Sequence, residues 1–404
     1  MFYKRYIIVA LLTILFFCIP LSELNINKIF NIKKYEDTPK VEEGEWETID
    51  NTGIIPREFP AAHLLPDGNI LIVGGSSETF RNWPMYIGNQ SGEIPDIAEI
   101  YNPTTKKVIK IIPLPDKRYS HFSSISLKNG DVFISGGTDY NYMPPNFHNT
   151  AKIFDAKKYI FKDVKPMAYK TANHNSILLD NGHILILRCI SNFKKKDNSN
   201  YQIYDPNKNN YYYTKNIPHA AWVNTNWMKL NNGNILIFSG RSYIYDVKKN
   251  TFEKTTQNFP IGVGDTFVSI SDNEYLSLDY KGTYTTGFVF KIKEQQKIPV
   301  DNKIDRVWNY PHEKPILVPL KNGNVLILGI DEYKLKNKKI RHYKNTAYIY
   351  NREKNIFYEI YPPRYSFDFK PAVIQLKNGD IMFIGGDAGR NSIQVYKYKQ
   401  NKEE

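Results

Sequence analysis

Cysteine is scarce in this 404-residue chain: there are two, and only Cys189 lies beyond the first 22 residues. A disulfide within the rest of the chain is therefore excluded, which rules out the small secreted folds that disulfides hold together. Cys189 ends an apolar run and is expected to pack as a small hydrophobic side chain rather than to serve as a nucleophile.

Sequence signatures of common enzyme chemistry are also missing. The chain has no HExxH, GxSxG, Walker-type glycine-rich loop or paired-cysteine motif, and these mark many metalloproteases, serine hydrolases, nucleotide-binding enzymes and zinc proteins. Gly262-Val263-Gly264 lacks the third glycine of a dinucleotide site. We therefore predict no catalytic residue, no metal site and no cofactor.

Only one long apolar run exists, residues 6–21, and it follows Lys4 and Arg5. A basic start before an apolar stretch is typical of a signal sequence, although the run is shorter than the roughly 20 residues that span a bilayer. No small residues suited to cleavage stand at its end, which favours an uncleaved signal-anchor. We expect a single-pass membrane protein with the later residues on the non-cytoplasmic side, or a secreted protein if residues 1–22 are cleaved.

Acidic residues are outnumbered by basic ones, 41 to 54, which gives a net charge of +13. The excess lysines are scattered beside asparagines in predicted turns, as at 194–196 and 336–339, and no nucleic-acid-binding module accompanies them. We therefore predict no nucleic-acid partner. Residues 23–44 read as a polar linker and residues 400–404 as a charged tail, which leaves 45–399 as one domain.

A hairpin phrase recurs along that domain. It reads LPDGNILIVGG at 65–75, LKNGDVFISGG at 127–137 and LKNGDIMFIGG at 376–386. Asn and Gly tolerate positive φ best, so the phrase predicts two apolar strands joined by a two-residue type I′ turn. Four weaker copies occur at 179–189, 230–240, 270–278 and 320–330.

An aromatic residue with a short polar tail follows each hairpin. These residues are Tyr101, Phe154, Tyr204, Tyr245, Phe290, Tyr350 and Tyr396. In the first six copies another apolar or aromatic residue comes seven or eight positions later, so the unit is four strands. The hairpin turns lie 40 to 62 residues apart, close to the roughly 40–50 residues of a four-stranded propeller repeat.

The seventh unit runs out at Lys399 after three strands, while Trp46–Ile49 is an isolated strand before the first hairpin. Pairing that strand into the last unit would close the ring and remove an exposed sheet edge. The predicted fold class is therefore all-β, a seven-bladed β-propeller preceded by one N-terminal hydrophobic helix, with six blades as the alternative.

The domain from about Trp46 to Lys399 resembles the Kelch-repeat propellers. The resemblance rests on the glycine pairs at 74–75, 136–137 and 385–386 and on the Tyr-Asn/Asp-Pro turns at 101–103 and 204–206. The third to sixth units depart from the pattern. Galactose-oxidase-like enzymes share this fold but need a copper site with a Tyr joined to a Cys, and Cys189 has no recognisable ligand set beside it. The resemblance therefore implies a fold and not a chemistry.

One side of such a propeller carries the long connections between strands, and a ligand site is expected there. The connections at 76–96 and 138–149 contain Trp83, Tyr140 and Tyr142, whose rings suit stacking on a sugar or a peptide. Arginines at the same side are expected to form a collar that attracts carboxylates or phosphates. The alternative is that each arginine pairs with a nearby acid. The predicted ligand-binding residues are Arg57, Trp83, Arg118, His121, Tyr140, Tyr142, Arg241, Arg364 and Arg390. His121 has a structural alternative too, as a histidine satisfied within the fold.

Two functions remain open from the sequence. The favoured one is an exported, membrane-anchored binding or scaffolding module for a protein or carbohydrate ligand. The alternative is a carbohydrate-active enzyme of the mutarotase, lyase or oxidase type that uses the same face. An acid, a histidine and an arginine around one small pocket would favour the enzyme, whereas a lining of Tyr, Asn and Ser would favour binding.

Overall fold

A computed structural model describes most of the chain from residue 44 to residue 398. The described residues are 44–75, 97–114, 121–139, 146–187, 201–214, 226–238, 242–257, 259–261, 266–281, 284–305, 314–334, 341–367, 370–386 and 390–398. The predicted N-terminal helix, residues 23–43 of the predicted linker and the C-terminal tail lie outside these residues, so those assignments stay predictions. Gly44, assigned to the linker, is the first residue of a strand. No helix in the described ranges has the length and apolar character needed to cross a membrane.

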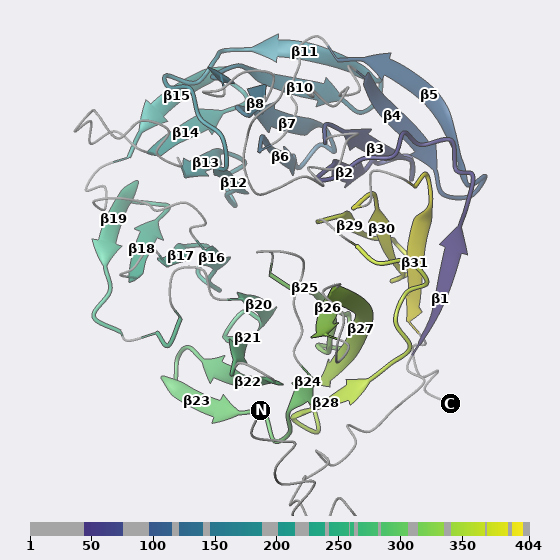
Figure 1. The fold of residues 1–404 in the computed structure, drawn as a ribbon. Helices are drawn as coiled ribbons and strands as arrows, with labels where there is room; N and C mark the ends of the chain where they lie inside the picture. Colours follow the sequence, from purple (N-terminus) through teal and green to yellow (C-terminus); the bar gives the residue numbers. More distant parts are fainter. Residues whose placement is uncertain are drawn as a thin grey trace, which may run out of the picture. The chain divides into compact units, whose positions relative to one another are not determined.

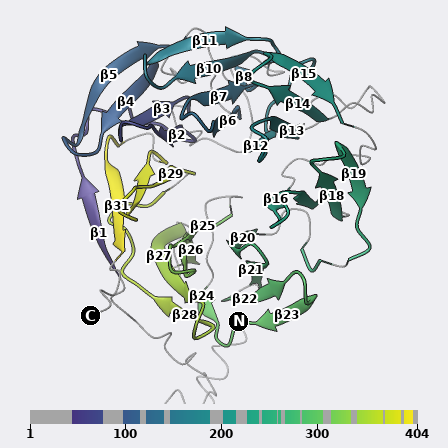
Figure 2. The same cartoon turned by 180° about the vertical axis from the view of Figure 1, so that it is seen from behind.

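Seven antiparallel sheets, numbered here as blades 1 to 7, are arranged in a ring (Figure 1), which confirms the predicted propeller. In each blade the first strand lies nearest the centre and the last lies at the rim, as the view from behind also shows (Figure 2). Blade 1 consists of β2 (Ala61–Leu64), β3 (Ile70–Val73), β4 (Ile97–Asn102) and β5 (Lys107–Pro113). Blade 2 consists of β6 (Ser123–Ser126), β7 (Val132–Ser135), β10 (Ala151–Asp155) and β11 (Ile160–Val164). Blade 3 consists of β12 (Asn175–Leu178), β13 (Ile184–Leu187), β14 (Tyr201–Asp205) and β15 (Asn210–Tyr213).

Blades 4 to 6 continue round the ring in the same order. Blade 4 consists of β16 (Asn226–Lys229), β17 (Ile235–Phe238), β18 (Ser242–Asp246) and β19 (Thr251–Lys254). Blade 5 consists of β20 (Thr266–Ser271), β21 (Glu274–Tyr280), β22 (Tyr284–Lys291) and β23 (Gln296–Pro299). Blade 6 consists of β25 (Ile316–Pro319), β26 (Val325–Lys334), β27 (Arg341–Asn351) and β28 (Ile356–Glu359). A short strand, β24 (Ile304–Asp305), also pairs with β22, and β8 (Thr138–Asp139) pairs with β9 (Asn146–Phe147) within a connection of blade 2.

Blade 7 closes the ring with a strand from the start of the domain. It consists of β29 (Ala372–Gln375), β30 (Ile381–Ile384) and β31 (Ile393–Tyr398), completed by β1 (Gly44–Ile49). β1 pairs with β31 from Gly44 opposite Tyr398 to Ile49 opposite Ile393. Trp46 anchors the junction, because its ring lies 5.6 Å from that of Phe383. The predicted closure by Trp46–Ile49 is confirmed, and seven blades replace the six-bladed alternative.

The second strand of most blades is fully buried, as its continuous apolar sequence predicts. Ile70–Val73, Ile184–Leu187 and Ile235–Phe238 are buried at every position. Their alternate side chains point into the interfaces with the two flanking blades, so that one core cluster joins blades 7 and 1 and another joins blades 3 and 4. Such strands are sandwiched on both faces, which is why they lack polar alternation.

The hairpin turns differ from the predicted type. In the first hairpin the Leu65 N–H donates to the Asn69 carbonyl and the Gly68 N–H donates to the Leu65 carbonyl, at 2.8 and 2.9 Å. Three residues therefore form the loop, and among them only Gly68 has positive φ, at 89°. This is a turn followed by a left-handed glycine rather than a two-residue type I′ turn. The prediction was wrong because Asn-Gly also fits this longer loop, where the Asn or Asp side chain bonds the backbone two residues on.

The aromatic phrase forms a second repeated device. The Tyr204 hydroxyl donates to Oδ1 of Asn209, five residues later, and Asn209 has a φ of 47°. The same bond recurs from Tyr245 to Asn250 and from Tyr350 to Asn355. Asn tolerates the left-handed conformation, so the buried tyrosine holds the turn between the third and fourth strands in place.

The glycine pairs allow a close approach between blades. Gly385 has a φ of 73°, and a β-carbon there would lie 2.6 Å from the Arg57 carbonyl oxygen. The Gly386 N–H donates to the same carbonyl at 3.0 Å. The end of β30 is thus joined to the segment that leads into blade 1, and a larger residue than glycine would separate them.

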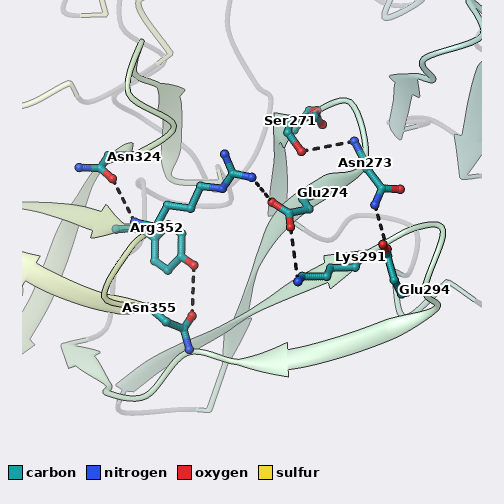
Figure 3. Close-up of polar contacts among 10 residues, drawn as sticks. Ser271, Asn273, Glu274, Lys291, Glu294, Asn324, Arg352 and Asn355 are labelled. Atoms are coloured by element: carbon teal, nitrogen blue, oxygen red, sulfur yellow. Dashed lines mark hydrogen bonds and ion pairs between the residues drawn. The ribbon is translucent and has the colours of Figure 1, made fainter.

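The two faces of the ring carry different structures. On the turn face, which holds the hairpin turns and the turns between third and fourth strands, polar side chains join neighbouring blades. Figure 3 shows Arg352 of blade 6 paired with Glu274 of blade 5, while Lys291 lies 4.0 Å from the same carboxylate. The opposite loop face holds the connections between second and third strands and the links between blades, where the functional residues are predicted.

Candidate functional site

A cavity of about 260 Å³ opens among the innermost strands of blades 3, 4 and 5. The described residues that line it are Asn175, Asn226, Trp227, Phe267, Val268 and Ser269, and together they are called the inner-strand cavity below. Asn175 and Asn226 are the first residues of β12 and β16, opposite the last residues of β13 and β17. Because links from the loop face lead into these strands, their first residues lie toward that face.

Repetition of the blade explains the lining. Asn175 and Asn226 hold the same position in neighbouring blades, so the ring brings two carboxamides to one side of the cavity. Trp227 packs partly against the core between blades 3 and 4, and Phe267 lies 5.3 Å, centroid to centroid, from Phe238. The aromatic wall is therefore held by the core, whereas Ser269 adds a hydroxyl. A rigid apolar wall with a few polar groups is typical of small-ligand sites.

The six described lining residues contain no titratable side chain. Amides, a hydroxyl and aromatic rings can donate and accept hydrogen bonds and stack on a ligand, but they do not supply an acid or a base. The chemistry of the described lining is therefore that of recognition.

Histidines that precede or lie within the inner strands serve the fold. His63 on β2 has a serine hydroxyl at each ring nitrogen, Ser126 at 2.9 Å and Ser124 at 2.8 Å, and burial lowers its pKa to about 4. Nε2 of the buried His174 lies 2.9 Å from the Ser135 hydroxyl. Each of these rings joins its own blade to the neighbouring one.

His121, a predicted ligand contact, lies in the link into blade 2. It has a φ of 59°, its ring stacks on Phe59 with centroids 6.3 Å apart, and its carbonyl accepts from the Asn173 N–H at 2.7 Å. Burial lowers the pKa of its imidazole. The structure therefore gives His121 the contacts expected of the structural alternative, and a role in ligand binding stays a prediction.

Arg57 is not on the surface as the collar requires. Its side chain is fully buried and pairs with the equally buried Glu99 of β4. Nη1 donates to the Gly74 carbonyl at 3.0 Å and Nε to the Ile55 carbonyl at 3.1 Å, while the other oxygen of Glu99 accepts from the Ile55 N–H. Burial lowers the pKa of Arg57 and raises that of Glu99, each opposed by the partner's charge. The placement in a ligand-accessible collar is corrected: Arg57 is inside the blade because Glu99 lies across from it.

Arg364 and Arg390 do meet on the loop face, at blade 7. The guanidinium carbons of Arg364 and Arg390 lie 5.2 and 4.3 Å from the centre of the same ring, that of Tyr365. Arg364 also lies 3.7 Å from Asp50, and both side chains are well exposed. Two of the five arginines predicted to bind a ligand thus lie at the ring of one tyrosine.

The remaining predicted contacts lie outside the described residues: Trp83, Arg118, Tyr140, Tyr142 and Arg241. Sequence reasoning in turn missed the inner-strand cavity. The available signal was positional, since Asn175 and Asn226 each stand nine residues before the second strand of their blade. Aligning the seven repeats by their hairpins would have placed these residues side by side at the mouth.

Metal chemistry is not supported by the donor groups that the structure describes. Within the described ranges no group of three or more His, Cys, Asp or Glu side chains is placed to hold a metal ion. A copper site of the kind found in oxidases with this fold does not fit these residues, so no step through a metal is derived.

Comparison with known proteins supports the fold and assigns no function. No protein-family model matches the chain, and no curated protein matches it. Among solved structures, a fungal alcohol oxidase of the AA5 family in complex with copper is similar, with a TM-score of 0.62 and 14% sequence identity over 88% of this chain and 77% of that chain. At this identity the likeness concerns the fold, and the Kelch assignment stays a prediction. The chain is a seven-bladed β-propeller of the architecture seen in that oxidase.

Proposed function

We propose that this protein is an exported binding propeller whose ligand is a glycan held at the inner-strand cavity. The observation that carries the proposal is the described lining of the cavity: two carboxamides, a serine hydroxyl, an indole and a phenyl ring, with no acid or base. Hydroxyl-rich, uncharged sugars need hydrogen bonds that both donate and accept, together with a flat apolar surface. The sequence left a protein partner open, and the lining favours the sugar.

Size limits the ligand further. A volume of about 260 Å³ lies just below the roughly 300 Å³ at which small-molecule sites begin. The cavity suits one sugar ring, as the end of a chain or a branch, rather than a whole oligosaccharide. The rest of a glycan would extend over the loop face.

The test is a glycan array followed by titration calorimetry on the best binder. Asn226→Leu removes an amide at constant size, and Trp227→Leu removes the indole wall. We expect each to weaken binding at least tenfold. Lys208→Gln on the turn face, where Lys208 is an exposed side chain 3.8 Å from Asp205, is the matched control and should bind as the unaltered protein does. The proposal would be wrong if the protein bound no glycan on the array. It would also be wrong if both cavity variants bound the glycan as tightly as the unaltered protein.

Location is part of the proposal. Residues 6–21 would hold the propeller at a membrane on its non-cytoplasmic side, as their apolar sequence and basic flank favour. Protease added to intact cells should then degrade the propeller, and deletion of residues 1–22 should leave it inside. A propeller protected in intact cells would contradict export.

An oxidase is the second candidate, suggested by the fold shared with the similar alcohol oxidase; the described residues supply no copper site, so its ligands would have to come from the rest of the chain. Peroxide release during alcohol oxidation by copper-loaded protein would support it. If the protein binds glycans and releases no peroxide, with or without added copper, the oxidase proposal is wrong and the binding function remains.

A further inference from the structure

The segment that links blade 6 to blade 7 is held along its backbone from several directions. Trp46 Nε1 donates to the Tyr361 carbonyl at 2.8 Å, and Asn345 Nδ2 donates to the Pro363 carbonyl at 3.2 Å. Two residues later, the buried Gln394 amide accepts from the Tyr365 N–H and donates to the Tyr365 carbonyl, both at 2.9 Å. Every second residue from 361 to 365 is therefore fixed by a side chain from another strand.

The segment is also anchored where it turns inward. Phe367 is buried, and its ring lies 5.2 Å from that of Phe383 in the core between blades 6 and 7. Between the fixed residues of this link, Pro362 and Ser366 are half-buried and Arg364 is exposed. Two-thirds of the Arg364 side chain is exposed.

Tyr365 then acts as a platform for two cations from different parts of the chain. Arg364 comes from the link itself, and Arg390 comes from the connection between β30 and β31. Their guanidinium carbons lie 5.2 and 4.3 Å from the Tyr365 ring centre, within the roughly 6 Å of cation–π attraction. The two guanidinium carbons are therefore no further apart than the sum of these two distances.

Two positive charges this close repel each other, because their separation does not exceed the roughly 8–10 Å over which salt screens charges. Asp50 lies 3.7 Å from Arg364, and both side chains are exposed, so this ion pair is weak. A guanidinium has five N–H donors, so each arginine can keep its protein partners and still donate to a ligand. An oxyanion between them would relieve the repulsion and accept charge-assisted bonds.

We propose that Arg364 and Arg390, held on Tyr365, form an oxyanion-binding subsite on the loop face of blade 7. The ligand group is a carboxylate, sulfate or phosphate, either as a small free anion or as the acidic group of a saccharide. The site does not depend on the inner-strand cavity, which lies in blades 3 to 5. The net charge of +13 would favour the approach of any such anion.

The test is titration calorimetry of the purified propeller at low and physiological salt. The probes are inorganic phosphate, inorganic sulfate, a galacturonic acid trimer and, as the neutral control, maltotriose. At least one of the three anionic probes should bind, and bind less tightly as salt rises, whereas any binding of the uncharged maltotriose should not depend on salt. Binding of all three anionic probes identifies a small-anion site, and binding of the trimer alone identifies an acidic saccharide.

Variants assign the binding to this site. Arg364→Gln and Arg390→Gln should each weaken the anion at least fivefold, and Tyr365→Leu should weaken it about threefold by removing the platform. Tyr365→Phe keeps the ring and should bind normally, whereas Asp50→Asn should bind two- to threefold more tightly. Arg352→Gln is the matched control, because Arg352 is paired with Glu274 on the turn face.

Far-UV circular dichroism and urea unfolding establish that each variant is folded. The proposal is overturned if no anionic probe binds, or if Arg364→Gln and Arg390→Gln both bind like the unaltered protein, since the anion would then be held by scattered lysines. Loss of maltotriose or other neutral-glycan binding in the cavity variants, with anion binding intact, tests the glycan proposal alone.

Discussion

The links into blade 1 and blade 7 hold equivalent backbone positions with opposite chemistry. In both, a side chain two residues before the buried tyrosine of the third strand accepts a backbone N–H: Glu99 from Ile55 and Gln394 from Tyr365. Two residues further along the link, Arg57 fills the space in blade 1 and Phe367 fills it in blade 7. Both are buried.

The difference shows that one structural position can be filled by an ion pair or by an apolar side chain. Glu99 needs a cation, because a buried carboxylate without one is costly, and Arg57 supplies it. Gln394 is neutral, so the link into blade 7 can use Phe367 and leave Arg364 at the surface. An arginine's role therefore depends on the residue across from it.

Breaking the ion pair of blade 1 should have the largest effect. Arg57→Leu leaves Glu99 buried without a counter-charge and should lower the free energy of unfolding by about 3–5 kcal/mol. The double variant Arg57→Phe with Glu99→Gln copies the pair found in blade 7 and should recover most of that loss. Urea unfolding measures both. A double variant as unstable as Arg57→Leu would show that the two links are not equivalent.

The junction of blades 7 and 1 offers the next largest change. Gly385→Ala places a β-carbon 2.6 Å from the Arg57 carbonyl oxygen at a φ of 73°, and should cost about 3 kcal/mol because backbone strain and a clash add up. Gly68→Ala, at a φ of 89° with no atom within 4 Å of the new β-carbon, should cost only about 1 kcal/mol. Thermal unfolding separates the two, and equal losses would mean that the contact at Gly385 is unimportant.

Acid should destabilise blade 1 through His63, for which blade 7 has Ile374 at the matching position. Burial lowers the pKa of folded His63 to about 4 from 6.5, so the neutral ring is favoured by folding. This stability is present above pH 6.5 and is lost as pH falls toward 4, by about 2 kcal/mol between pH 7 and pH 5. His63→Asn should remove that part of the pH dependence, which urea unfolding at a series of pH values measures. The same dependence of the free energy of unfolding on pH in both proteins would contradict the prediction.

The smallest effect is expected at the surface of blade 7. Asp50 and Arg364 are 3.7 Å apart and exposed, so Asp50→Asn should change the free energy of unfolding by less than about 0.5 kcal/mol. Urea unfolding at low and high salt measures this. A loss comparable to that of Arg57→Leu would mean that the surface pair is structural, as the pair in blade 1 is.

Much of the fold could be predicted from the sequence because its signals are local. Apolar runs, hairpin turns and aromatic phrases repeat, and the orphan strand at Trp46–Ile49 matches the strand missing from blade 7. The turn type was misjudged, since the same Asn-Gly pair fits a two- or a three-residue loop. The site was harder, because Arg57 and Arg364 both follow a proline in the link before a blade, yet Arg57 is buried against Glu99 and Arg364 is exposed beside Asp50.

The sequence by itself determined the repeated four-stranded blade and the closure of the ring, and it favoured seven blades over six, because each depends on neighbouring residues and on counting repeats. Only the tertiary structure decided which arginine is buried and which lies over the ring of Tyr365, and that an open cavity forms among three inner strands beside Trp227. These features join residues from different blades. Their energies depend on how deeply each side chain is buried and on the charge of the residue that it contacts. The spacing of residues within a single repeat gives neither of these.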